Sequence, residues 1–249
     1  MSRKQAPTLE RPSLLPAQPN RSLIDGLAVL SALAVSREPI GSRELARRLG
    51  WNPMRVNRLL RTLAAVGMAH QTADRRYTAG PAMHVLSVQA IYASGLFTRA
   101  MAAVEMLPRD RHGVALGVLW QDQVCYLFHA KPGEPLASAV GAHGLYPATQ
   151  SSIGMVLLAA MAEQQVRELF ASRPIVGHEQ IDDLLRDLRL VREDGYACVV
   201  QQRRPRQASV AVPIGEPAYA ALALTHDIRK RNLSHLLPAM KRTAAAIAG

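Results

Sequence analysis

Six arginines lie between residues 41 and 67, in a segment whose other residues are mostly small or apolar. A guanidinium group can pair with a phosphate or bind the edge of guanine, and an asparagine side chain can bind adenine through two hydrogen bonds. These residue types therefore suit contact with nucleic acid. The candidate DNA contacts are Arg43, Asn52, Met54, Arg55, Asn57, Arg58 and Arg61, with Arg75 and Arg76 farther along the chain.

Two short helices joined by a tight turn are predicted to carry most of these residues. Ser42 is the expected N-cap of the first helix, over residues 43–49, and Gly50 ends it. Asn52 caps the second helix and Pro53 takes its first position, where a missing N–H costs nothing. Its apolar residues recur at the 3.6-residue period and point to one side, at Val56, Leu59, Leu60 and Leu63.

One more helix is predicted before this pair and a β-hairpin after it. Ser22 and Asp25 have the spacing of a capping pair, and Gly67 ends the third helix. Residues 68–80 indicate two strands around a polar turn at 72–75. Together these elements predict a winged helix-turn-helix, whose second paired helix enters the major groove of DNA. The apolar stripe expected for the first helix is Leu23, Leu27, Leu30 and Ala34.

The charge distribution fits a polyanionic partner for this part of the chain. The net formal charge is +11, and residues 1–80 hold 13 Lys and Arg against 5 Asp and Glu. The basic excess therefore lies in the first third. A solvated basic face and a membrane-surface helix are the alternatives, but the apolar stripes lack the Trp and Phe that anchor such a helix in lipid.

The remaining composition limits the class of protein. The 249 residues allow two domains, and no apolar run approaches the roughly 18 residues of a membrane helix. Residues 1–19 contain four prolines and no apolar signal-peptide core, which predicts a disordered arm. Cys125 and Cys198 do not make a disulfide framework, so a reduced, cytoplasmic compartment is expected.

The second part of the chain alternates strand-like and helical stretches. Their order predicts an α+β fold with a mostly antiparallel sheet. Strands are expected over 113–120, 124–130, 136–140, 196–200, 208–214 and 219–225, and helices over 151–162, 163–172, 180–195 and 228–248. Either Ser151 or Ser152 is expected to cap the first of these helices, and Leu184, Leu185, Leu188 and Val191 to form the apolar stripe of the third.

Three stretches resemble the winged helix-turn-helix of the isocitrate lyase regulator (IclR) family of bacterial transcription factors. They are "SRELARRLG", "VNRLLRTLAAVGMA" and "RRYTAGPAMHVL". The resemblance implies a DNA-binding domain over 20–80, a linker helix over 81–95 and a GAF-like effector-binding domain over 96–249. Family members commonly begin the recognition helix with a Lys-Ser-Thr-like run, where this chain has Pro53, Met54 and Arg55. Base preference therefore does not carry over.

The stretch "VGAHGLYPATQSSIGMVLLA" resembles the effector-binding motif of the same family. The resemblance implies that a small, often anionic effector binds at the start of this helix, where N–H groups favour negative charge. The candidate effector contacts are Ser151, Ser152, Ile153 and Gly154, with Ser209 in a second matching stretch. Arg203, Arg204 and Arg206 either pair with an anionic effector or form a solvated loop, and a degenerate pocket without a ligand also stays open.

Enzymatic motifs are not evident. "HEQID" at 178–182 begins like a zinc motif, but Asp182 occupies the position of the second histidine. No nucleophile elbow, P-loop or dinucleotide fingerprint occurs. Cys125 and Cys198 lie in apolar strands, where a structural thiol is the default over a nucleophile or a redox sensor.

The sequence thus predicts a sequence-specific DNA-binding regulator with a small-molecule sensor, no enzymatic activity, no metal and no cofactor. Its partners would be a pseudo-palindromic double-stranded operator, an effector, and further copies in a homodimer or homotetramer, with no membrane. Two rival functions remain, a regulator with a dead sensor and a nucleic-acid-binding protein without sequence preference. The residues available for pairing in the linker helix are Val85, Leu86 and Val88.

Overall fold

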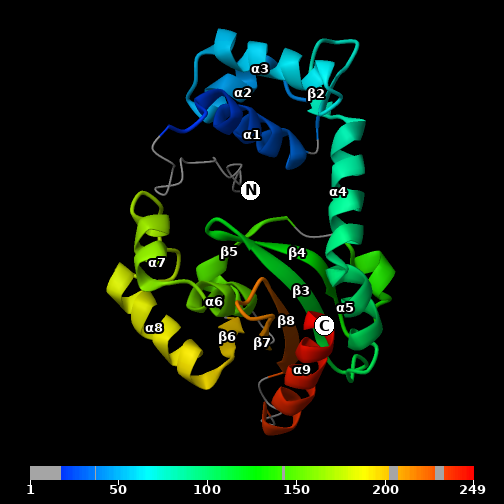
Figure 1. Ribbon diagram of the computed structural model, residues 1–249, viewed down its shortest axis with the longest axis vertical. Coiled ribbons are helices and arrows are strands. Elements are labelled where there is room, and N and C mark those ends of the chain that lie inside the picture. The colour runs from blue at the N-terminus through cyan, green and yellow to red at the C-terminus, as the bar shows by residue number, and fades with distance from the viewer. Residues whose placement is uncertain (1–17, 37, 142–143, 202–206, 228–232) are drawn as a thin grey trace. The chain divides into compact units, whose positions relative to one another are not determined.

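The computed structural model describes residues 18–36, 38–141, 144–201, 207–227 and 233–249 (Figure 1). The chain forms two compact units, Met1–Ala93 and Ser94–Gly249, each with its own hydrophobic core. Nearly all of the N-terminal arm expected at residues 1–19 lies outside the described residues. In the part of the chain that the structure describes, no helix combines the length and apolar character needed to cross a membrane.

The described residues of the first unit form three helices, a two-stranded hairpin and most of a further helix. Its elements are α1 (Arg21–Ala34), α2 (Ser42–Leu49), α3 (Pro53–Ala65), β1 (Ala69–Gln71) and β2 (Tyr77–Ala79), followed by α4 (Pro81–Ser94). The strands pair antiparallel, and Ile40 adds a bridge to Tyr77. Side chains from all three helices and from the hairpin share one core, which includes Leu33, Leu45, Val56, Leu60 and Tyr77.

The turn between α2 and α3 follows the sequence prediction closely. Gly50 adopts a left-handed φ of 66°, which ends α2 at little steric cost. The Asn52 Oδ1 accepts a 2.8 Å hydrogen bond from the backbone N–H of Met54, and Pro53 takes the first position of α3. Val56 and Leu60 are buried, with Leu59 and Leu63 partly buried beside them. The predicted capping and core stripe of α3 are therefore confirmed.

Three details of the first helices were predicted wrongly. Asn20, not Ser22, caps α1, since its Oδ1 accepts a 3.0 Å hydrogen bond from the N–H of Leu23. Gly41 is the N-cap of α2, so Ser42 lies inside that helix. The expected stripe of α1 is also wrong, because Leu23 and Leu27 are exposed. The buried face of α1 consists of Asp25, Ala28, Val29, Ala32 and Leu33.

The second unit is built on an antiparallel sheet. Among the described residues, six strands pair in the order β5-β4-β3-β8-β7-β6. They are β3 (Gly113–Trp120), β4 (Gln123–Ala130), β5 (Tyr146–Pro147), β6 (Ala197–Gln201), β7 (Gln207–Ile214) and β8 (Ala220–Asp227). All the pairings are antiparallel, so the predicted fold class is confirmed.

Helices cover both faces of this sheet (Figure 1). One face packs against α5 (Leu96–Val104) and α9 (Leu233–Ala248) through large side chains such as Leu116, Val212 and Leu222. The other face packs against α6 (Ser152–Ala159) and α8 (Ile181–Asp194), with α7 (Glu163–Phe170) beside them. On that face the central strands present alanines, which let the fully buried α6 lie close to the sheet. These are Ala115, Ala211, Ala221 and Ala223.

The predicted elements of this unit are mostly present, with one clear error. Leu136–Ala139 forms a 3₁₀ helix, η1, instead of a strand, and only Val140 bridges to Phe128. Its Pro135 start and the hydrogen bond from the N–H of Ser138 to the Pro135 carbonyl favour a turn over an extended strand. The sequence analysis also missed α5, β5 and the 3₁₀ turn η2 (Ala148–Gln150). The expected start of the last helix at 228 lies outside the described residues.

Candidate DNA-binding and effector sites

The outer face of α3 carries the main group of predicted DNA contacts. Each residue advances about 100° around a helix, so positions 54, 57, 58 and 61 fall within an arc of roughly 100°. All four side chains are exposed, Met54 by 82%. Together with Arg55, Thr62 and the end of the helix, they line a shallow hollow of about 780 Å³. A face with one amide, two guanidinium groups and a thioether can offer hydrogen bonds and apolar contacts to base edges.

Arg55 differs from its neighbours on α3. Its side chain is 37% exposed, and its guanidinium hydrogen-bonds to the Asp25 carboxylate on α1, whose side chain is 8% exposed. The same guanidinium lies 4.9 Å from the centre of the Trp51 ring, in the turn that precedes α3. Both contacts tie Arg55 to the protein itself.

The hairpin places the last two predicted DNA contacts on an exposed turn. Arg75 has a positive φ of 60°, and Thr72 organises the turn by hydrogen bonds to Asp74 and to the backbone of Arg76. Arg76 forms a 3.1 Å ion pair with Asp74. The turn therefore presents one partly neutralised cation and a neighbouring arginine to solvent.

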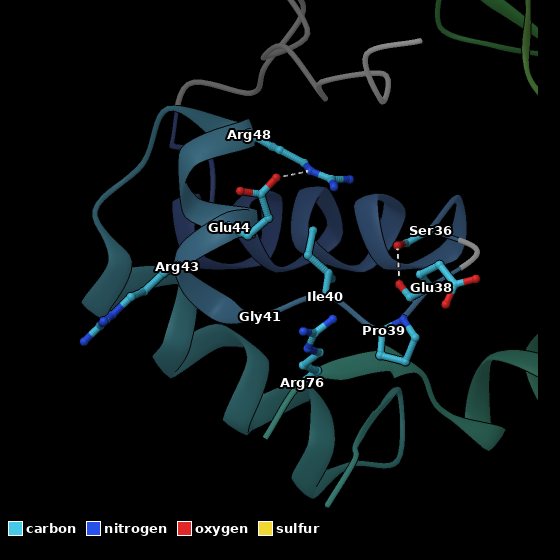
Figure 2. A pocket seen from close by; sticks show the side chains of 9 residues that line it. All are labelled: Ser36, Glu38, Pro39, Ile40, Gly41, Arg43, Glu44, Arg48 and Arg76. Carbon is cyan, nitrogen blue, oxygen red and sulfur yellow. Dashed lines mark hydrogen bonds and ion pairs between the residues drawn. The ribbon is translucent and has the colours of Figure 1, made fainter. Parts of the chain in front are cut away.

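A second hollow, of about 460 Å³, lies beside the start of α2 (Figure 2). Residues 36 and 38–41, the first turns of α2 and Arg76 of the wing line it. Arg43 points away from it in Figure 2, and Glu44 binds Arg48. Hydrogen bonds from Arg47 and Arg48 lower the pKa of Glu44 from 4.5 to about 2, so this carboxylate stays charged and offsets part of the local positive charge.

The predicted effector residues meet at the start of α6. Ser151, Ser152, Ile153 and Gly154 are all buried there, and Ser152 shares a 2.8 Å hydrogen bond with Ser209 of β7. Ser151 is the N-cap by backbone conformation, but its hydroxyl does not cap the helix. The structure thus brings together two serines that are 57 residues apart in the chain.

Tyr126 is a residue of this site that sequence reasoning missed. Its hydroxyl lies 3.0 Å from the Ser151 Oγ, and its ring stacks on His129 with centroids 5.4 Å apart. Burial raises the pKa of Tyr126 above its ordinary value, so the phenol stays protonated near neutral pH and can donate a hydrogen bond. No motif marks this tyrosine, because only the pairing of β4 with β5 brings it to the start of α6.

Packing alone requires a glycine at position 154, independently of any ligand. A Cβ placed on Gly154 would lie 2.1 Å from the carbonyl oxygen of Ala148 and 2.4 Å from its Cα. The turn η2 therefore approaches the first turn of α6 more closely than any side chain permits. Thr149 anchors the same turn, since its hydroxyl donates a 2.7 Å hydrogen bond to the Val176 carbonyl.

The other candidates are outside this cluster. Arg203, Arg204 and Arg206 lie outside the described residues. Within the residues that the structure does describe, no group of three or more His, Cys, Asp and Glu side chains could hold a metal ion. Cys125 is half-buried, and burial raises the pKa of its thiol, whereas Cys198 is exposed on β6 and only partial desolvation raises its thiol pKa.

This combination defines a class of protein. A helix-turn-helix with a basic, exposed second helix, joined to an antiparallel sensor-type domain, is a two-domain DNA-binding regulator. The sequence profile of the IclR helix-turn-helix domain matches residues 22–73, and that of the bacterial transcriptional regulator IclR C-terminal domain matches residues 88–248. The chain therefore belongs to the IclR family of transcriptional regulators, which confirms the predicted family and the prediction of a DNA-binding transcriptional regulator.

Individual relatives agree with this assignment. The chain is 27% identical to the Pca regulon regulatory protein of Pseudomonas putida over 210 aligned residues. This alignment covers 81% of this chain and 72% of that protein. An IclR homologue from Microbacterium hydrocarbonoxydans, complexed with 4-hydroxybenzoate, has a TM-score of 0.67 at 22% identity, over 91% of this chain and 97% of that one. The crystal structure of an IclR family regulator from Brucella abortus has a TM-score of 0.71 at 20% identity, and the match covers 97% of this chain and 98% of that one. Both solved structures share the fold.

Proposed function

We propose that the outer face of α3 reads an operator in the major groove. The observation that carries this proposal is the exposed arc of Met54, Asn57, Arg58 and Arg61 opposite a well-packed core stripe. Arg58 and Arg61 suit guanine edges or phosphates, Asn57 suits adenine, and the Met54 side chain suits the methyl group of thymine. Arg43, Arg75 and Arg76 lie outside this arc and would contact phosphates. A DNA partner places the protein in the bacterial cytoplasm.

The test is binding of the purified full chain to its own upstream DNA and to scrambled DNA at two salt concentrations. We expect a preference for the upstream DNA that persists at the higher salt, because base contacts depend less on counterion release than phosphate contacts do. Arg58→Ala should weaken operator binding and, if Arg58 neutralises a phosphate, lower the salt slope by about 1. Equal, steeply salt-dependent binding to both DNAs would instead identify a non-specific nucleic-acid-binding protein.

We also propose that the effector is a small carboxylate that binds at the start of α6. Hydroxyl groups of Ser151, Ser152, Tyr126 and Ser209 converge there, and the N-terminus of a buried helix favours an anion. The 4-hydroxybenzoate bound to the Microbacterium homologue belongs to the same chemical class. In this chain the hydroxyls bond in two pairs, Tyr126 with Ser151 and Ser152 with Ser209, so a ligand would replace these hydrogen bonds with its own.

Thermal unfolding with 4-hydroxybenzoate and other small carboxylates tests this proposal, with the matching neutral amides as controls. A carboxylate effector should raise the melting temperature as its concentration rises above Kd, whereas its amide should not. If no small carboxylate stabilises the chain or changes operator binding, the sensor is degenerate or takes another class of ligand.

We further propose that the chain binds DNA as a homodimer, to which α4 contributes. No residue of α4 is buried within this chain, although the helix presents Val85, Leu86, Val88 and Tyr92 to solvent. An exposed apolar helix of this kind is stabilised when a second copy covers it, and a symmetric dimer matches a pseudo-palindromic operator. Analytical ultracentrifugation of Leu86→Glu should show a shift toward monomer, with Gln89→Glu as the matched charge control.

A further inference from the structure

Arg55 lies at the edge of the face of α3 that is proposed to read DNA. Its side chain lines the same hollow as Asn57 and Arg58, but its guanidinium is engaged by the protein itself. At about 100° per residue, position 55 lies roughly 60° beyond position 58, toward the buried positions. Its half-buried side chain agrees with this placement, whereas the side chains at 54, 57, 58 and 61 are exposed. The guanidinium is directed to Asp25 and to the Trp51 ring.

We propose that Arg55 is a positioning residue that fixes α3 against α1, and that it adds no contact to DNA. This inference rests on the proposed reading of DNA by the outer face of α3. The Asp25–Arg55–Trp51 cluster joins three segments, namely α1, the turn before α3 and the first turn of α3. It thereby sets the angle at which Met54, Asn57 and Arg58 project from the domain.

The chemistry of the cluster supports a positioning role. The Asp25 carboxylate lies on the buried face of α1, among Ala28 and Val29, and a buried carboxylate needs a partner charge. Arg55 supplies that charge and is neutralised by it. A planar guanidinium can also lie over an aromatic ring while it bonds a carboxylate, which lysine cannot do as well.

The cluster acts where a small movement matters most. Asn52 caps α3 only one residue after Trp51, so the contact between Arg55 and the Trp51 ring lies directly beside the start of the helix. Loss of the Arg55 contacts would let the first turn of α3 shift, and contacts to base edges depend on placement within a fraction of an ångström. Affinity for the right sequence should therefore fall more than affinity for DNA in general.

The experiment compares the full chain with four variants, Arg55→Gln, Arg55→Lys, Asp25→Asn and Arg58→Gln, on operator and scrambled DNA over a range of salt. Arg55→Gln should lower operator affinity about tenfold and leave the salt slope unchanged, because a neutralised arginine releases no counterion. Arg58→Gln should instead lower the slope by about 1 if it contacts a phosphate. Arg55→Lys keeps the charge but not the planar guanidinium, and should still lose part of the operator preference.

Asp25→Asn provides the opposite perturbation. It frees the Arg55 guanidinium, so we expect reduced operator preference together with a salt slope that is larger by about 1. The double variant Asp25→Asn/Arg55→Gln should bind the operator no more weakly than Arg55→Gln alone, because the two residues act through one contact. Circular dichroism at the assay temperature shows that each variant is folded.

Two results would overturn the inference. A loss of about one unit of salt slope in Arg55→Gln would show that Arg55 contacts a phosphate directly. Unchanged operator preference in Asp25→Asn would show that the cluster does not set the position of α3. Failure of the proposed DNA-reading function would appear elsewhere, as a wild-type chain and an Arg58→Gln variant that do not distinguish operator from scrambled DNA.

Discussion

Replacement of Gly154 by alanine should destabilise the sensor unit strongly. The added Cβ would lie 2.1, 2.4 and 2.6 Å from the O, Cα and C atoms of Ala148, all of which belong to the backbone. No rotamer change can relieve such contacts, so η2 and the start of α6 must separate by roughly 1 Å. Because α6 is buried on every side, that movement also disturbs the alanine face of the sheet.

The expected cost is about 3 kcal/mol, at the upper end of what an added methyl group causes in a well-packed core. For a unit of this size, that cost corresponds to a fall in melting temperature of roughly 6–12 °C. Gly144→Ala is the matched control, because a Cβ at Gly144 would have no heavy atom within 4 Å. It should change the stability by less than about 0.5 kcal/mol.

The two units contain one tryptophan each, Trp51 in the first and Trp120 at the end of β3. Urea unfolding followed by Trp120 fluorescence in a Trp51→Phe background therefore reports on the sensor unit alone. If Gly154→Ala unfolds at the same urea concentration as its parent, the close approach of η2 to α6 does not constrain this position. If the Gly154→Ala variant is stable but has lost its effector response, Gly154 contributes directly to ligand binding.

Three further predictions concern the sensor, the pH dependence and one thiol. Ser152→Ala, which removes only the hydroxyl shared with Ser209, should weaken the effector response and leave basal operator binding intact, and loss of both would indicate a folding defect. Glu44 has a pKa of about 2 when folded and 4.5 ordinarily, so its stabilising contribution is present above about pH 4.5 and is lost toward pH 2. The difference in unfolding free energy between wild type and Glu44→Gln should therefore decrease as the pH falls from 4.5 to 2. A difference that stays constant with pH would contradict this prediction. Cys125, which is half-buried, should react with iodoacetamide more slowly than free cysteine at pH 7 and faster as the pH rises, because burial raises the pKa of its thiol. Mass spectrometry at several pH values measures this, and fast labelling of Cys125 at pH 7 would refute it.

The helix-turn-helix was predictable because local chemistry determines it. Gly50, Asn52 and Pro53 specify how one helix ends and the next begins, and the apolar period of α3 leaves one orientation for its core side. The same reasoning failed for α1, where the exposed leucines are larger than the buried alanines. Its buried face includes the charged Asp25, whose partner on α3 lies 30 residues away and is not marked by any spacing rule.

The candidate effector site was only partly predictable for a similar reason. The family resemblance indicated the start of α6 and Ser209, and the structure brings Ser152 and Ser209 together. Tyr126 and η2 reach the site through strand pairing and a turn, which depend on the whole sheet. Residues that meet by tertiary pairing leave no local periodic signal in the sequence.

The place of β8 in the sheet has a consequence for synthesis on the ribosome. This strand is the last to leave the exit tunnel, yet it lies between β3 and β7 and joins the two halves of the sheet. Until residues 220–227 emerge, the β3–β4 and β6–β7 hairpins have no common partner, and the sensor cannot complete its core. The helix-turn-helix relies on contacts within residues 18–93 and can fold much earlier, as domains do during translation. A nascent or truncated chain would thus carry a finished DNA-binding domain before it acquires the means to be regulated.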